Sequence, residues 1–422
     1  MEIEMDIVLL TIGYPHPNRD VFVENEIKYI SENFENVYII PVIEGKLYPK
    51  KNKFNKVKNM PDNVKILNIE YRYFDFFNID NKLLKECMKD MFLNTKFNFR
   101  LILKKFRWYI HSKIVLKNIN NLVEKETLVK KKTILYSFWF HFNSMAIACT
   151  EGEFALKVSR AHGYDLYEER GIQPCKKFIT KELDYIFPCS DLGKKYLIDK
   201  YKYKEKFIKS YLGTSNKFNV DIVDNRGKCF NIVSCSSIIS IKRLDKIIDA
   251  LSIIESHNIR WKHIGDGSLA KKIKEYAEKK LGNKKNIEFE FLGNIENNKV
   301  LEYYYKNEIN LFINVSSTEG LPVSIMEAIS FGIPVIATNV GGVREIIDSN
   351  KNGYLLNEEF KSSELSNMIL KFIEMGSSKY VNMRNESFKK WSNEFNSEKN
   401  YEKYFHELKT NANKVNNIGV NL

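Results

Sequence analysis

The sequence lacks the cysteine and histidine patterns that build metal sites or disulfide frameworks. Its 422 residues include six cysteines, none of them in a Cys-x-x-Cys pair. Scattered cysteines of this kind indicate neither a zinc ribbon nor a disulfide scaffold, and they fit a reducing compartment. The seven histidines show no ligand spacing either. We therefore expect no metal site.

Long apolar runs are also missing. No uncharged stretch approaches the roughly 18 apolar residues of a membrane-spanning helix. The first ten residues carry acidic side chains before a short apolar run, which predicts a strand and not a signal peptide. We expect a cytoplasmic protein that is soluble or peripheral on the inner face of the cytoplasmic membrane.

What the chain does have is positive charge, and that charge is unevenly distributed. The formal net charge is +13, and residues 82–132 contain 14 basic against four acidic residues. Within them, Phe97–Lys113 interleaves aromatic and basic residues, a mixture typical of contact with an anionic membrane or with nucleic acid. Part of the charge reflects a chain rich in lysine throughout. Because no nucleic-acid module is visible, we expect peripheral membrane contact through residues 82–132 and no nucleic-acid partner.

The length and the alternation of elements predict an α/β protein with two domains. Short apolar segments that predict parallel strands are Ile7–Leu10, Val37–Pro41, Val64–Ile69, Thr133–Tyr136, Phe154–Val158, Tyr185–Pro188, Phe230–Cys235, Arg260–Ile264, Ile287–Leu292, Ile309–Val315, Pro334–Ala337 and Tyr354–Leu356. We expect a first domain over residues 1–212, a polar linker over 213–228 and a second domain over 229–387. Helices over 388–422, with an aromatic stripe from Trp391 to Phe405, are expected to return to the first domain.

The most informative stretch runs from Val315 to Glu345. A polar loop ends in Glu319-Gly320-Leu321, and a helix is predicted to start with Pro322 and to stop at Gly332. A helix start with a glycine before it suits a phosphate. The two carboxylates, Glu319 and Glu327, should lie roughly 10 Å apart. That is too far for the acid–nucleophile pair of a retaining glycosidase, which needs about 5 Å, but it suits two hydroxyl-bearing ends of one ligand.

This stretch resembles the Glu-x7-Glu signature of the GT4 retaining glycosyltransferases. The resemblance rests on E-G-L-P-V-S-I-M-E-A, with Gly332-Ile333-Pro334 and Gly341-Gly342 in register. It implies the GT-B fold, in which two Rossmann-like doubly wound domains face each other across a cleft and a C-terminal helix crosses back. It also implies transfer of a sugar from a nucleotide sugar with retention and without a metal. A UDP-sugar is expected ahead of a GDP-sugar.

The resemblance implies roles for single residues. Glu319 would hold the donor sugar near its C3 and C4 hydroxyls, Glu327 the ribose, and Gly320 and Leu321 would face the diphosphate. Lys242 matches the lysine of the family, but Ser237 stands where an arginine is usual, and whether Arg243 substitutes for it is left open. The remaining candidates are His162 at the donor sugar or its phosphate, Gly13 in the first loop, Gly265 near the nucleotide and Asn294 near the base.

The acceptor half of the chain is less recognisable. Arg160, Asp165 and Tyr167 share a loop with His162 and are expected to shape the acceptor side. The basic, aromatic first domain suits a glycan on an anionic lipid carrier, as in capsule, O-antigen or cell-wall polysaccharide assembly. The alternatives are a nucleotide-sugar epimerase and a catalytically silent nucleotide-sugar-binding partner of an assembly complex, the latter favoured by Ser237.

Overall fold

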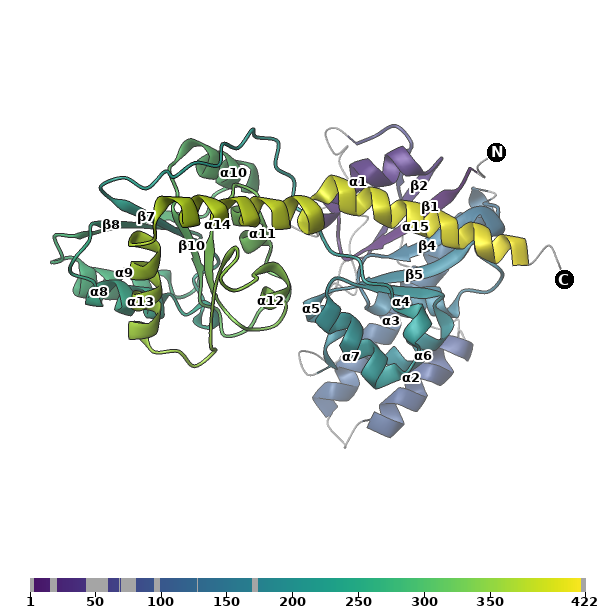
Figure 1. The fold of residues 1–422 in the computed structure, drawn as a ribbon. Helices are drawn as coiled ribbons and strands as arrows, with labels where there is room; N and C mark the ends of the chain where they lie inside the picture. Colours follow the sequence, from purple (N-terminus) through teal and green to yellow (C-terminus); the bar gives the residue numbers. More distant parts are fainter. Residues whose placement is uncertain are drawn as a thin grey trace. The chain divides into compact units, whose positions relative to one another are not determined.

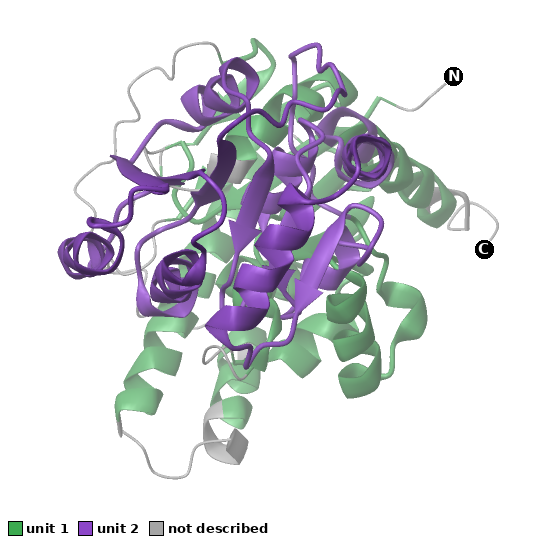
Figure 2. Cartoon of the chain, turned by 60° about the vertical axis from the view of Figure 1, so that its left-hand side comes forward, with its two compact units in different colours: residues 1–210, 401–422 green, residues 211–400 purple. Residues whose placement is uncertain are grey.

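The chain divides into two compact units. The computed structural model describes residues 4–15, 21–42, 60–67, 69, 81–94, 99–126, 128–168 and 174–418. Contacts place Met1–Ser210 and Tyr401–Leu422 in unit 1, and Tyr211–Asn400 in unit 2 (Figure 2). The predicted linker, 213–228, thus lies within unit 2, and the predicted returning segment, 388–422, is divided between the units.

Unit 1 is built on a six-stranded sheet in the order β3-β2-β1-β4-β5-β6. All its pairs are parallel, with helices around the sheet (Figure 1). The strands are β1 (Asp6–Thr11), β2 (Val37–Pro41), β3 (Val64–Ile66), β4 (Thr133–Ser137), β5 (Leu156–Ala161) and β6 (Tyr185–Pro188). Strands β2 and β4 are buried along their whole length, which is why they read as apolar runs.

The helices of unit 1 precede or follow these strands. They are α1 (Val21–Asn33), α2 (Asn81–Asn94), α3 (Phe99–Lys125), α4 (Phe142–Cys149), α5 (Gly163–Leu166), α6 (Lys176–Glu182) and α7 (Asp191–Tyr201), with short 3₁₀ turns η2 (Lys130–Lys132) and η4 (Lys204–Lys206). The C-terminal helix α15 (Ser397–Ile418) packs its aromatic residues into the core that also contains β1 and α1.

Unit 2 repeats the same topology. Its strands lie in the order β12-β11-β10-β7-β8-β9, again all parallel. They are β7 (Phe230–Cys235), β8 (Ile259–Ile264), β9 (Ile287–Gly293), β10 (Leu311–Asn314), β11 (Val335–Thr338) and β12 (Gly353–Leu356). Each half of such a sheet grows away from its first strand, so the direction of growth reverses between β7 and β10.

The helices of unit 2 complete the α/β alternation. They are α8 (Leu244–Ile253), α9 (Ala270–Leu281), α10 (Asn297–Lys306), α11 (Val323–Ile329), α12 (Val343–Ile346), α13 (Ser362–Ile373) and α14 (Ser377–Lys390), with a 3₁₀ turn η5 (Ser240–Lys242) before α8. Helix α8 buries Ile247, Ile248 and Leu251 on the face that the sequence predicted. Two doubly wound units with this strand order confirm the predicted α/β fold class.

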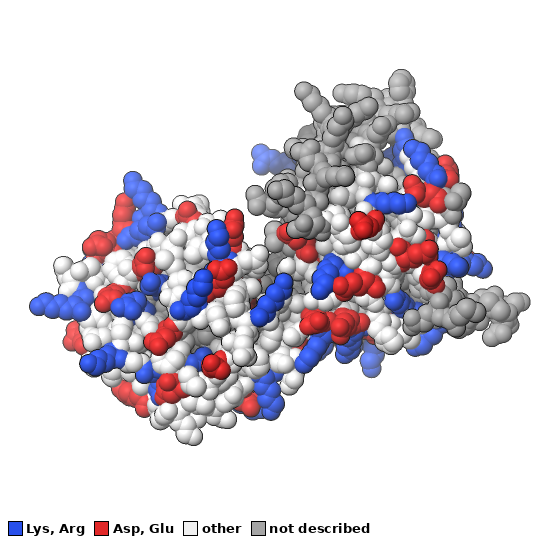
Figure 3. Space-filling model, turned by 90° about the horizontal axis from the view of Figure 1, so that it is seen from above, with Lys and Arg blue, Asp and Glu red and all other residues white. Residues whose placement is uncertain are grey.

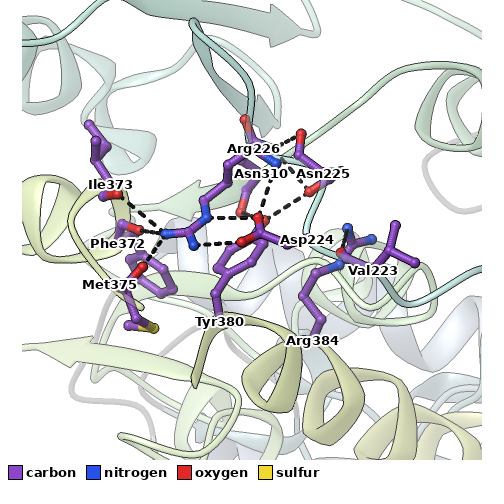
Figure 4. A network of polar contacts seen from close by, with 10 residues as sticks. All are labelled: Val223, Asp224, Asn225, Arg226, Asn310, Phe372, Ile373, Met375, Tyr380 and Arg384. Atoms are coloured by element: carbon purple, nitrogen blue, oxygen red, sulfur yellow. Dashed lines mark hydrogen bonds and ion pairs between the residues drawn. The ribbon is translucent and has the colours of Figure 1, made fainter. Parts of the chain in front are cut away.

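Arg226 holds the polar segment before β7 against the rest of unit 2. Its Nη1 donates to the carbonyl oxygens of Phe372, Ile373 and Met375 at 2.8, 3.3 and 2.7 Å, where helix α13 ends. The guanidinium also pairs with Asp224 at 2.7 Å and lies 4.3 Å from the ring centroid of Tyr380 (Figure 4). A cation at a helix C-terminus stabilises its unpaired carbonyls, so this segment is an anchored part of the unit.

The aromatic stripe expected on one returning helix is divided between two cores. A π-helical turn, η6 (Trp391–Phe395), separates α14 from α15. Trp391 and Phe395 belong to a core of unit 2, whereas Tyr401, Tyr404 and Phe405 belong to unit 1. The interpretation of a single stripe packing on the first domain is therefore correct only for its second half.

Two surface features bear on the expected membrane contact. None of the helices that the structure describes is long and apolar enough to cross a membrane. On the face drawn in Figure 3, basic and acidic side chains are interspersed. The positive net charge of the chain is therefore not gathered there into a surface of one sign.

Candidate functional site

The predicted donor-side residues follow four strands of unit 2. Lys242 comes after β7, Gly265 after β8, Asn294 after β9 and Glu319 after β10. Parallel strands end at one edge of a sheet, and ligands of open α/β sheets bind at that edge where the strand order reverses. Here the reversal lies between β7 and β10, the two strands that Lys242 and Glu319 follow.

Glu319 and Lys242 are in direct contact across this reversal. Lys242 Nζ lies 2.6 Å from Oε1 of Glu319, although 77 residues separate them in the sequence. Ser316 Oγ and Asn314 Nδ2 donate to the same oxygen at 2.6 and 3.2 Å. Both charged side chains are mostly buried, at 10% exposure for Glu319 and 19% for Lys242. Asn314 and Ser316 are site residues that sequence reasoning missed, although both lie within five residues of Glu319.

Glu327 is held separately, inside α11. It is 6% exposed, and Nδ2 of Asn297, at the start of α10, donates to its Oε1 at 2.6 Å. Burial raises the pKa of Glu327 to about 7, and the hydrogen bond from Asn297 acts in the opposite direction. Asn297 was not predicted. Its only sequence signal is a polar side chain at a helix start just after a strand.

Two glycines allow the loop before α11 to pack tightly. Gly341 has φ of 52°, and a Cβ added there would lie 2.0 Å from the carbonyl oxygen of Glu319. The N–H of Gly342 donates to the carbonyl of Gly320 at 2.7 Å. Gly332 has the predicted left-handed conformation, with φ of 65°, but α11 ends at Ile329, three residues before it. Pro322 is the N-cap of α11 and not its first residue.

Arg243 is engaged by the protein itself. Its Nε donates to the carbonyl of Val315 at 2.7 Å, and its Nη atoms donate to the carbonyls of Glu358 and Ser316 at 2.8 and 3.3 Å. The guanidinium also lies 5.4 Å from the ring centroid of Phe360. These contacts favour a structural role in holding the loop after β10. Its substitution for the arginine absent at Ser237 stays a hypothesis.

Gly265 and Asn294 lie at the ends of neighbouring strands. Gly265 has φ of 135°, and a Cβ there would lie 1.9 Å from the carbonyl oxygen of Ser236. Its N–H donates to the carbonyl of Gly293 at 2.8 Å. These contacts explain why the position requires glycine whether or not a nucleotide binds. Asn294 is exposed directly after Gly293.

The candidates in unit 1 also follow strands. Gly13, with φ of 116°, comes after β1, and His162 comes after β5. The His162 ring is buried, with ring-centroid distances of 5.0 Å to Phe138 and 4.5 Å to Trp139. Burial opposes its protonation, but Cys189 and the carboxylate of Asp165 outweigh burial and raise the pKa of His162 to about 10.

The expectation that Arg160 and Asp165 shape the acceptor side from a loop is wrong for their side chains. Arg160 lies within β5 and is fully buried. Asp165 is also fully buried, and its carboxylate accepts the backbone N–H groups of Phe140 at 2.6 Å and of His162 at 2.5 Å. Both side chains face the interior of unit 1. Tyr167 is partly exposed.

Comparison with known proteins shows that most of unit 2 is similar to a known family. Residues 218–390 match the family described as "Glycosyl transferases group 1". One relative is the UDP-N-acetylglucosamine–peptide N-acetylglucosaminyltransferase GtfA subunit of Streptococcus agalactiae, 31% identical over 31% of this chain and 25% of its own length. Another is the amylovoran biosynthesis glycosyltransferase AmsK of Erwinia amylovora, 27% identical over 48% of this chain and 51% of its own length.

A solved structure extends the likeness to both units. Anabaena Alr3699/HepE in complex with UDP has a TM-score of 0.63 and 16% identity, and the match covers 96% of this chain and 100% of that one. For the Streptococcus and Erwinia relatives, the match covers about a quarter and a half of their length, respectively. The fold of the chain is therefore GT-B, and its second unit is similar to the group 1 glycosyl transferases.

Proposed function

We propose that this protein is a retaining glycosyltransferase of GT4 type that transfers a sugar from a nucleoside diphosphate donor to a glycan acceptor. One observation carries the proposal. Lys242 and Glu319, which follow the two strands between which the strand order of unit 2 reverses, are in contact at 2.6 Å, and Glu327 lies in the helix that follows Glu319.

In the proposal, the two carboxylates bind different parts of the nucleotide-sugar donor. We assign the ribose hydroxyls to Glu327, which is buried and held by a hydrogen bond from Asn297. We assign the sugar hydroxyls to Glu319, whose carboxylate is held by hydrogen bonds from Ser316 and Asn314. Gly320 and Leu321 supply the backbone that faces the diphosphate. The UDP in the HepE complex and the UDP-sugar in the name of the Streptococcus relative favour a UDP-sugar donor.

Lys242 provides the charge that transfer needs. As the bond between the anomeric carbon and the phosphate oxygen breaks, negative charge collects on the diphosphate, and a fixed cation stabilises it. We assign this role to Lys242, whose ammonium group is held at the loop by its ion pair with Glu319. By the resemblance, His162 would assist at the sugar or its phosphate. The protein contributes positioning and charge stabilisation, with attack on the face that the diphosphate leaves.

The acceptor side of the proposal is a lipid-linked glycan at an anionic membrane. Helix α3 contains no acidic residue from Phe99 to Val123. Its exposed residues near the start form one stripe at helical spacing: Arg100, Leu103, Lys104, Phe106 and Arg107. Leu103 and Phe106 are 46% and 49% exposed. Apolar side chains beside a basic edge match the interface of an anionic bilayer. The amylovoran relative favours polysaccharide assembly as the setting.

A second candidate is a donor-binding partner without turnover. Ser237 replaces the expected arginine, and the contacts of Arg243 with main-chain carbonyls direct its guanidinium toward the loop. If Lys242 alone cannot stabilise the leaving diphosphate, the protein would bind a nucleotide sugar and never cleave it.

A thermal-shift and hydrolysis screen against UDP- and GDP-sugars tests both candidates, with Glu327→Ala as the comparison. The transferase predicts that one nucleotide raises the melting temperature, that Glu327→Ala loses this shift, and that one donor is slowly hydrolysed. A shift without hydrolysis or transfer would support the silent partner. No shift with any donor would contradict both.

A further inference from the structure

Unit 1 contains a buried ion pair that the proposed reaction does not use. Glu26 of α1 and Arg160 of β5 are both 0% exposed, and Nη2 of Arg160 lies 3.5 Å from Oε1 of Glu26. The hydroxyl of Tyr136, on β4, donates to the same carboxylate oxygen at 3.0 Å. A helix and two adjacent strands therefore meet at one buried carboxylate.

The C-terminal helix covers this pair. The guanidinium carbon of Arg160 lies 4.2 Å from the ring centroid of Tyr404 and 5.8 Å from that of Tyr401, both on α15. The face of an aromatic ring attracts a cation and replaces part of its lost hydration. Tyr404 also packs edge-on against Phe187 of β6, with ring centroids 4.9 Å apart. Helix α15 thus closes the cluster from outside the sheet.

Stability alone does not account for the cluster. Among the residues that the structure describes, Oε2 of Glu26 has no hydrogen-bond partner, and the contact of Arg160 with the other carboxylate oxygen is 3.5 Å long. Removing two charges from water is costly even with the hydrogen bond from Tyr136 and the rings over Arg160, and well-packed apolar side chains of similar volume are often as stable. A buried pair of this kind is better explained by the positions that it fixes.

The position that it fixes is the end of β5. Arg160 and His162 are two residues apart, so they lie on the same side of the extended chain. Phe138 links the two regions, since its ring centroid lies 6.4 Å from that of Tyr136 and 5.0 Å from that of His162. Burial raises the pKa of Glu26, and Arg160, Tyr136 and His162 act in the opposite direction. His162 therefore lies within the field of the pair.

We propose that Glu26, Arg160 and Tyr404 form a positioning unit that holds the end of β5 and His162, so that helix α15 takes part in building the site of unit 1. The importance of His162 for transfer rests on the proposed function. The fixing of the strand end is a property of unit 1 itself and can be measured without any substrate.

The test compares two substitutions on the same helix, Tyr404→Leu and Phe405→Leu. Phe405 is also fully buried, and it packs edge-on against Phe34 at a centroid distance of 5.9 Å. Both substitutions remove a buried aromatic ring, but only Tyr404 covers Arg160. Tyr404→Phe keeps the covering ring and serves as the conservative variant. Hydrogen exchange of the segment 159–166 and steady-state donor hydrolysis are measured for each.

We expect Tyr404→Leu to raise exchange at the end of β5 by about tenfold, because local opening becomes easier. We expect it to lower kcat at least about tenfold, with the donor KM within about twofold, because a misplaced group weakens the transition state more than donor binding. Glu26→Gln should act in the same direction, and Tyr404→Phe should resemble the unchanged protein. Phe405→Leu should leave exchange at this segment and kcat within about twofold.

Equal effects of Tyr404→Leu and Phe405→Leu on the segment 159–166 would overturn the proposal, since α15 would then contribute packing alone. If the unchanged protein hydrolyses no donor, the proposed function fails. The exchange comparison still decides whether Tyr404 and Glu26 fix the strand end.

Discussion

Replacing Glu327 by glutamine is expected to stabilise unit 2 at neutral pH while weakening its hold on a nucleotide. Glutamine has nearly the shape of a protonated glutamate and keeps the oxygen that accepts the 2.6 Å hydrogen bond from Asn297. It removes the buried negative charge. The substitution therefore separates the cost of that charge from the packing of the side chain.

The size of the effect follows from the pKa of Glu327. Burial raises it from 4.5 to about 7, and each pKa unit corresponds to about 1.4 kcal/mol. Ionising Glu327 in the folded protein therefore costs about 3 kcal/mol at pH 8, relative to ionising it in the unfolded chain. The sign follows because the folded state binds the proton more tightly. The stability that protonated Glu327 contributes to the folded protein is fully present below pH 4.5 and is lost as the pH rises through about 7.

The difference between the variant and the unchanged protein cancels the other titrating groups. At pH 5, half a pH unit above the unfolded pKa of 4.5, the cost falls to about 0.8 kcal/mol, and the variant should melt only about 2–3 °C higher. At pH 8 the variant should melt about 6–12 °C higher, at roughly 2–4 °C per kcal/mol for a unit of this size. Glu302→Gln, at an exposed position of α10, is the control. A difference that is the same at pH 5 and pH 8, or a less stable variant at pH 8, would refute the reasoning.

The same variant should bind a nucleotide less well. Hydrogen bonds to a charged group contribute about 1.5–3 kcal/mol, so losing the charge should raise the Kd for UDP by roughly 10- to 100-fold. Calorimetric titration at pH 8 measures this loss directly. Unchanged affinity, together with the expected gain in stability, would show that Glu327 is buried for a reason other than ribose binding.

Three further changes probe other parts of the account. Lys242→Ala should lower kcat about 100-fold or more with the donor KM within about threefold, because a cation on the leaving diphosphate acts mainly in the transition state. Steady-state kinetics in which kcat falls and the donor KM rises by similar factors would argue against this role. Gly341→Ala should lower the melting temperature and remove the UDP-induced shift, since its Cβ would lie 2.0 Å from the carbonyl oxygen of Glu319. Gly376→Ala, with no neighbour within 4 Å of the added Cβ, should change neither quantity. Equal effects of the two substitutions would show that the loop tolerates the methyl group. The double variant Lys104→Glu/Arg107→Glu should no longer float with vesicles containing anionic lipid, because the substitutions reverse the charge along the basic edge of α3. Retained flotation would show that α3 is not the contact surface.

Much of the fold could be predicted because its strands are buried on both faces. The bounds of β2 and β6 agree with the predicted segments Val37–Pro41 and Tyr185–Pro188, since central parallel strands read as uninterrupted apolar runs. The order of the strands then brings their carboxyl ends together, which is why residues chosen from four separate loops lie along one edge of the sheet.

The contacts between side chains could not be predicted in the same way. Glu319 pairs with Lys242 across 77 residues and Glu327 with Asn297 across 30, and no local pattern records such partners. Arg160 read as a loop cation because a charged residue is seldom buried, yet it lies inside β5 beneath α15. Helical periodicity continued through Trp391–Phe395, but it does not reveal a π-helical turn that directs the two halves of one stripe into two cores.

The most direct test of the account is a crystal structure of the protein with UDP bound. The account predicts the ribose hydroxyls on the carboxylate of Glu327 and the diphosphate beside Gly320 and Leu321, within reach of Lys242. A nucleotide bound away from the loops after β7 and β10, with Glu327 making no contact to it, would contradict the account.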